Sequence, residues 1–213
     1  MMTAVLSKFW KQFRYSFHIL THPFDGFYDI KHEKKGSAAI STLFVFLLIV
    51  TFILKRQFTG FVLNTSRSSD LNIFAEAAGV LLPFGLWCIS NWCLTTLTEG
   101  EGSFRDIYIY SGYALLPMIL INLPMIVYSN FVVQEEAGFY SFFIGLAMVW
   151  SGLLFMVGTL VTHQFTLSKT IFSLVVIIVG MGVIAFIGLL FFNLIQQMYD
   201  FVSNLYYEYS FRI

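Results

Sequence analysis

Side chains that could bind a metal or move protons are few in this chain of 213 residues, and most lie in two short polar segments. His18, His22 and His32 belong to the first segment, but their spacing matches no closed zinc pattern and no cysteine accompanies them. Glu99 and Glu101 belong to the second, where no neighbouring nucleophile or metal ligand completes a catalytic site. The sequence also lacks three common catalytic motifs: His-Glu-x-x-His, Gly-x-Ser-x-Gly and Cys-x-x-Cys. We therefore expect a protein that is not an enzyme and that uses no metal or cofactor.

The elements that must position these polar segments are five long apolar stretches. They lie at about 36–54, 74–97, 107–131, 138–161 and 171–192. A helix that crosses a hydrocarbon core about 30 Å thick needs about 20 apolar residues, so each stretch is long enough to span a bilayer. The composition agrees, because the chain is 58% hydrophobic and only 11% charged, whereas a soluble domain is closer to about a quarter charged. The sequence predicts an all-α, polytopic membrane protein, a bundle of five transmembrane helices.

The remaining residues form short flanks and loops rather than a separate soluble domain. We expect residues 1–35 to be a cytoplasmic amphipathic flank and residues 36–192 to be the membrane domain. Residues 193–213 then extend the last span outside the membrane. Lys plus Arg number 12 and balance the 12 Asp plus Glu, which excludes a strongly basic nucleic-acid-binding protein.

The distribution of basic residues predicts the orientation in the membrane. Eight of the 12 Lys and Arg side chains lie on the N-terminal side of the predicted bundle. Since cytoplasmic loops carry an excess of Lys and Arg, we expect the N-terminus in the cytoplasm and the C-terminus outside. Lys55 and Arg56 follow the first span on the outer side, where we expect them to snorkel to the interface.

The N-terminal flank has the pattern of an amphipathic helix over residues 5–20. Its apolar residues recur at three- and four-residue spacing: Leu6, Phe9, Trp10, Phe13, Phe17 and Leu20. The opposite face is basic, which is typical of a helix lying in the plane of a membrane surface. Such a helix either anchors the chain or docks under a partner, with Phe9, Trp10, Phe13 and Phe17 as the contacts. Recognition by a calmodulin-like protein is a more remote alternative. After it, Pro23 and Asp25-Gly26 favour a turn, and residues 28–35 are expected to be a polar lead-in to the first span.

The loop between the second and third spans is the most distinctive polar segment. Two glycines lie among its charged residues, and the candidates for partner contacts are Glu99, Gly100, Glu101, Gly102 and Arg105. We expect the glycines to permit a tight, left-handed backbone, and Ser103 to cap the next helix with Asp106 in its first turn. The two carboxylates and the missing Walker pattern exclude a phosphate-binding loop of that type. A plain helix connector and a partner-docking elbow both fit this pattern.

Polar groups within the spans are sparse. Asn91 and Asn122 are expected to form hydrogen bonds between helices, and mid-span charges of the kind that transporters use are missing. Three prolines, Pro83, Pro117 and Pro124, kink the second and third spans, either for packing or to line a transport path. A strip of small residues in the last span favours close helix contact: Gly180, Gly182, Ala185 and Gly188.

Helical periodicity continues beyond the fifth span. A continuous helix over 171–209 would measure about 58 Å, nearly twice the hydrocarbon thickness, so it must leave the membrane or bend along its surface. Tyr206, Tyr207 and Tyr209 near its end suit either an interfacial aromatic belt or contact with a partner protein or sugar.

Three stretches of the chain resemble a known family. They are His22-Pro23-Phe24-Asp25-Gly26-Phe27-Tyr28-Asp29-Ile30-Lys31, the segment 91–107 with its Gly-x-Gly elbow, and Tyr113-Ala114-Leu115-Leu116-Pro117. Together with five spans, they are similar to the Yip family of Ypt-interacting-protein-like membrane proteins, in its bacterial branch. The resemblance covers about residues 20–192; the amphipathic N-terminus and the long C-terminal helix look like additions. Glu99 departs from the family pattern, which has Asp before the first glycine.

The resemblance implies a protein that works through other membrane proteins. Eukaryotic relatives act with small GTPases in vesicle traffic, whereas bacterial relatives are often encoded beside carbohydrate ABC importers. It therefore implies a non-enzymatic accessory subunit of such an importer in a bacterial plasma membrane. Its partners would be the lipid bilayer, the permease subunits and an extracellular solute-binding protein. The alternatives are a standalone channel or transporter for small solutes and a membrane-shaping or trafficking adaptor.

Overall fold

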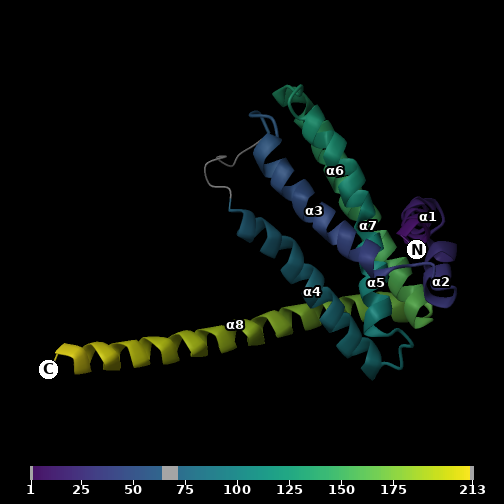
Figure 1. Ribbon diagram of the computed structural model, residues 1–213. Coiled ribbons are helices and arrows are strands. Elements are labelled where there is room, and N and C mark those ends of the chain that lie inside the picture. The colour runs from purple at the N-terminus through teal and green to yellow at the C-terminus, as the bar shows by residue number, and fades with distance from the viewer. Residues whose placement is uncertain (1, 64–71, 212–213) are drawn as a thin grey trace.

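The computed structural model describes residues 2–63 and 72–211, and this part of the chain is helical throughout apart from short connections (Figure 1). Two helices, α1 (Met2–Thr21) and α2 (Pro23–His32), form an N-terminal hairpin. They are followed by α3 (Ala38–Phe58), α4 (Ile73–Leu97), α5 (Phe104–Ala114) and α6 (Leu116–Tyr128). A short 3-10 turn, η2 (Gln134–Glu136), leads into α7 (Ala137–His163), and α8 (Leu167–Phe211) ends the described chain.

Five segments of this structure are long and apolar enough to cross a membrane: α3, α4, the pair α5–α6, α7 with η2, and α8. The predicted all-α bundle of five spans is confirmed. The third span is two helices rather than one, and the break lies at Leu115. Pro117 follows in the first turn of α6, where its missing N–H is not needed, so the kink predicted at this proline is also confirmed.

The N-terminal hairpin differs from the prediction. Residues 28–35 were expected to be a polar lead-in, and Asp25-Gly26 a turn, but both belong largely to α2. Pro23 starts this helix in its first turn, a position that suits proline. The helix is held by burial of Phe27 and Ile30, and Gly26 lets its backbone approach α1, because an added Cβ would lie 2.8 Å from Ile19. The turn prediction was wrong because glycine here serves close packing.

The bundle core is organised around α5. Ile107 and Tyr110 of this helix are fully buried, and Tyr113 is 1% exposed. The Tyr110 hydroxyl accepts a hydrogen bond from Asn91 Nδ2 of α4 at 2.5 Å and lies 3.0 Å from Thr159 Oγ1 of α7. The predicted hydrogen bond between helices is therefore present at Asn91, and it ties the central helix to two neighbours.

At the far end of the bundle, Lys55 and Arg56 contact neighbouring helices. Lys55 Nζ donates to Asn122 Oδ1 of α6 at 3.1 Å, and Arg56 Nη1 pairs with Glu76 Oε1 of α4 at 2.8 Å. Both side chains thus have partners on neighbouring helices, and their snorkelling to the interface stays a prediction.

Among the described residues, helix α8 packs against the bundle through its first half. Ser90 Oγ of α4 donates to the Ile177 carbonyl at 2.8 Å, and Gly180 lies against Ser90 and Leu94. Gly182 and Gly188 have no atom within 4 Å of an added Cβ, so the small-residue strip packs a neighbouring helix at Gly180 but not at these two glycines. Beyond this contact α8 runs away from the other helices (Figure 1). The helix is continuous beyond the fifth span, as predicted, and its 45 residues measure about 68 Å at about 1.5 Å per residue.

Candidate functional site

The elbow, residues 98–103, joins α4 to α5 at the end of the molecule where the N-terminal hairpin lies (Figure 1). Helix α4 ends there with a Schellman pattern, in which the Gly100 N–H donates to the Thr95 carbonyl at 2.8 Å. The left-handed residue of this pattern is Glu99, with φ of 59°. No glycine of the described chain has a positive φ, so the expected left-handed glycine is wrong.

The two elbow glycines instead make room for a buried histidine. An added Cβ on Gly100 would lie 2.7 Å from His163 Nδ1, and one on Gly102 would lie 2.6 Å from His163 Cε1. His163, the last residue of α7, is 1% exposed, and its Nδ1 accepts a hydrogen bond from the Gly102 N–H at 3.3 Å. Because Nδ1 accepts this bond, it cannot carry a proton, and the ring proton belongs on Nε2. The sequence gives no sign that His163 lies against the elbow, because the two are more than 60 residues apart.

Two lysines link the elbow to other helices. Lys31 of α2 pairs with Glu101 at 3.1 Å, and Lys169 of α8 donates to the Thr98 carbonyl at 2.8 Å. Lys169 also lies 4.2 Å from the centre of the Phe165 ring. Exposed ion pairs contribute roughly 0–1 kcal/mol each, so these contacts fix the relative positions of α2, the elbow and α8 more than they stabilise the fold. We call the elbow with Lys31, His163 and Lys169 the elbow hub.

The start of α5 agrees with the prediction. The Asp106 N–H donates to Ser103 Oγ at 3.3 Å, and the Ser103 N–H donates to Asp106 Oδ2 at 3.2 Å, which completes a capping box. This box holds the outer half of the elbow, and it leaves Arg105 exposed beside it.

The hairpin next to the elbow hub is closed by a polar cluster that sequence reasoning missed. Asp29 Oδ2 accepts hydrogen bonds from Tyr15 Oη at 2.7 Å and from Lys35 Nζ at 2.6 Å. The hydrogen bond from Lys35, followed by that from Tyr15, holds the pKa of Asp29 below its ordinary value. Burial, with the Asp29 carboxylate beside it, raises the pKa of Tyr15. A tyrosine and an aspartate 14 residues apart give no sequence signal until α1 and α2 are known to be antiparallel.

The apolar face predicted for α1 is divided between the core and the surface. Phe13 packs on Phe44 of α3 at 5.9 Å between ring centres, whereas Trp10 is 68% exposed and Phe17 is exposed as well. Phe9 lies outside the residues whose side chains the structure describes. Trp10 and Phe17 therefore remain candidates for contact with lipid or a partner.

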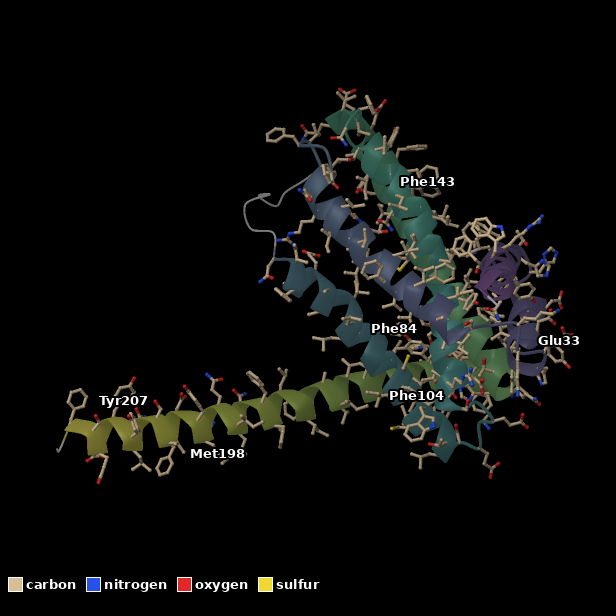
Figure 2. The ribbon with its side chains drawn as sticks, viewed as in Figure 1. Glu33, Phe84, Phe104, Phe143, Met198 and Tyr207 are labelled. Atoms are coloured by element: carbon tan, nitrogen blue, oxygen red, sulfur yellow. The ribbon has the colours of Figure 1, made fainter. Side chains whose placement is uncertain are left out.

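The other predicted contact residues form two separate groups. Glu99, Glu101 and Arg105 are exposed in the elbow region, while Gly102 is buried. The three tyrosines of the C-terminal extension are exposed at the far end of α8: Tyr206, Tyr207 and Tyr209. Figure 2 shows Tyr207 far from Phe104, which follows the elbow. The structure thus brings the N-terminal flank and the elbow together and leaves the tyrosines apart.

The histidines of the N-terminal flank are engaged in ring contacts. The rings of His18 and His22 stack at 5.0 Å, and His32 stacks on Tyr28 at 4.1 Å. Among the described residues, no group of three His, Cys, Asp or Glu side chains is placed to hold a metal ion.

Five membrane-spanning segments, a helical hairpin across one end and a glycine elbow beneath it define a polytopic integral membrane protein. The family model of the Yip1 domain matches residues 17–189, so the chain belongs to the Yip1 domain family. The match includes α2, the elbow hub and the packed half of α8, and it excludes most of α1, with Tyr15, and the free half of α8. No curated protein and no solved structure matches the chain.

Proposed function

We propose that this protein is a non-enzymatic structural or regulatory subunit of a larger membrane complex. The observation that carries the proposal is the free half of α8. Its apolar side chains are exposed, among them Leu194, Ile195, Met198, Phe201, Val202 and Leu205. Since the hydrocarbon core is about 30 Å thick, roughly half of this helix extends beyond it, where an apolar stripe favours contact with another protein.

The elbow hub, which lies far from the free half of α8, also supports the proposal that the protein is a subunit of a complex. Its backbone is hydrogen-bonded to His163 and Lys169, and Lys31 pairs with the Glu101 side chain, while Glu99 and Arg105 remain exposed. A rigid elbow with exposed charges suits docking to a partner that reads its shape and charge.

The most specific form of the proposal is an accessory subunit of a carbohydrate ABC importer in a bacterial plasma membrane. Its support is the resemblance of the elbow and hairpin segments to bacterial relatives encoded beside such importers. In this arrangement the hairpin lies on the cytoplasmic side and packs beside the permeases. Helix α8 then reaches outward, and its terminal tyrosines contact the solute-binding protein or the sugar.

A standalone channel or transporter has weaker support. One cleft between the spans, about 440 Å³, is lined by apolar residues that include Pro83, Trp87 and Phe155. Such a lining offers few polar groups to replace the hydration of a small polar solute. Of the three predicted kinks, only Pro83 borders this cleft.

The test is affinity purification of the full-length protein from its native membrane in mild detergent, with mass spectrometry of the proteins that accompany it. We expect stoichiometric permease subunits, an ATPase and a solute-binding protein. Replacing Met198, Phe201 and Leu205 by Ser should reduce this recovery, because these residues share the apolar face of α8. The matched control replaces Gln197 and Asn204 of the opposite face by Ser and should leave recovery unchanged.

Other outcomes of this purification decide between the alternatives. A homo-oligomer without permeases would contradict the subunit proposal and direct attention to solute flux in vesicles. A protein that carries no partner but sorts to curved membranes would indicate a membrane-shaping or trafficking adaptor.

A further inference from the structure

A polar groove of about 510 Å³ lies between the N-terminal hairpin and the starts of α3 and α5. Its charged lining consists of Lys31, Lys34, Arg105 and Asp106. Ile30 and Ile109 form an apolar part of the wall. The groove is separate from the apolar cleft between the spans and from the free half of α8.

The charge of the groove is positive. Lys34 and Arg105 are exposed and form no ion pair with any described residue. Lys31 is already paired with Glu101. The carboxylate of Asp106 accepts hydrogen bonds from the Ser103 N–H at 3.2 Å and from the Ser103 hydroxyl at 2.6 Å, so the capping box partly satisfies it. Two cations thus remain without a charged partner at the groove.

The position of the groove indicates which anions meet it. Two membrane-spanning segments, beginning at Ala38 and Phe104, start at its rim. The groove therefore lies where the chain enters the membrane, at the depth of the lipid headgroups. Helix α1 beside it exposes Trp10, a side chain that favours this interfacial layer. Anionic lipid headgroups attract Lys and Arg side chains at this depth.

We propose that this groove binds the phosphate group of an anionic membrane lipid. Lys34 and Arg105 contact the phosphate oxygens, and Arg105 can present two parallel N–H donors to them. Ile30 and Ile109 contact the apolar part of the same lipid near its headgroup. The proposal concerns a lipid and does not depend on the protein partner proposed above.

The experiment measures lipid binding to the full-length protein in detergent by native mass spectrometry, with phosphatidylglycerol and phosphatidylcholine as probes. We expect phosphatidylglycerol to bind the natural protein at least about tenfold more tightly, and added salt to reduce the difference because the two cations are exposed. The double variant Lys34→Gln/Arg105→Gln should lose this preference. The control Arg14→Gln removes an exposed cation of α1 that does not line the groove, and it should keep the preference.

A competition measurement and a conservative variant complete the experiment. Glycerol phosphate and inorganic phosphate distinguish a lipid site from a site for free phosphate: if either displaces phosphatidylglycerol at equal concentration, the lipid assignment is wrong. Arg105→Lys keeps the charge and should retain part of the preference, which separates loss of binding from loss of folding. Equal lipid preference in the natural protein and a folded double variant would overturn the proposal.

Discussion

His163 shows how one buried side chain sets the size of its neighbours. The imidazole fills the space beneath the elbow, and the elbow backbone approaches it so closely that residues 100 and 102 must lack a Cβ. The glycines are thus required by the ring of a residue more than 60 positions away, while the left-handed turn beside them is made by Glu99.

We expect Gly102→Ala to destabilise the protein. The new methyl group would lie 2.6 Å from His163 Cε1 and 2.9 Å from Thr162 Cγ2, and overpacking of this kind costs about 1–3 kcal/mol. Thermal unfolding in detergent measures the effect. The control is Gly138→Ala in α7, which meets nothing within 4 Å and should leave stability unchanged or slightly raised. Equal melting temperatures for the two variants would contradict the role assigned to Gly102.

The Asp29 cluster predicts a dependence on pH. Because the folded-state pKa of Asp29 is lowered, its stabilisation is present above the ordinary carboxyl pKa of about 3.9 and is lost as the pH falls through the folded value. Asp29→Asn should therefore lower the melting temperature at pH 7, and the difference from the natural protein should shrink below about pH 4. A difference that stays constant from pH 7 to pH 3 would show that the carboxylate charge is not responsible.

At the scale of elements, the packing of α8 depends on a short contact with α4. Ser90 donates to the Ile177 carbonyl, and Gly180 lets the helices approach at the same level. Small residues have this role in membrane helices because close approach allows more van der Waals contact. The first half of α8 is also held at the end of α4, where Lys169 donates to the Thr98 carbonyl, whereas its second half is long, apolar and exposed.

Gly180→Leu should loosen the contact between α4 and α8. An added Cβ would already lie 2.6 Å from Ser90 Oγ and 2.7 Å from Leu94 Cδ1, so the larger side chain forces the helices apart. We expect a loss of stability of about 1–3 kcal/mol, read as a lower melting temperature. Gly182→Leu, two residues on and without a neighbour within 4 Å, is the matched control and should behave like the natural protein.

For the whole molecule, the ends of the helices define two faces. The elbow hub and the hairpin form one face, and the loop around η2 lies at the other end of α7 (Figure 1). The excess of Lys and Arg near the first face is the reason for proposing that this face lies in the cytoplasm.

Labelling of single cysteines tests this orientation. In a background of Cys88→Ala and Cys93→Ala, a membrane-impermeant maleimide added to intact cells should label Glu136→Cys but not Glu101→Cys. Both sites should react after the membrane is opened. Labelling of Glu101→Cys alone in intact cells would contradict the proposed orientation. Labelling of both sites in intact cells would contradict the presence of one membrane span between them.

Some elements of this fold could be predicted from the sequence and others could not, for physical reasons. The five spans were predicted because hydrocarbon thickness imposes a minimum apolar length that is visible along the chain. The capping box at Ser103 and Asp106 was predicted because both residues lie within one helical turn. Helix α2 was missed, since its stability comes from burying Phe27 and Ile30 against other helices rather than from local pattern.

The sequence alone determined that this is an all-α membrane protein with five spans, a basic N-terminal flank and an overlong last helix. Each of these properties is local, because hydrophobicity, helical period and charge can be counted along the chain. The tertiary structure decided that His163 fills the elbow, that Lys31 reaches Glu101, and that Tyr15 meets Asp29. These contacts join distant residues through the angles and spacing of packed helices, which depend on close packing of the whole bundle.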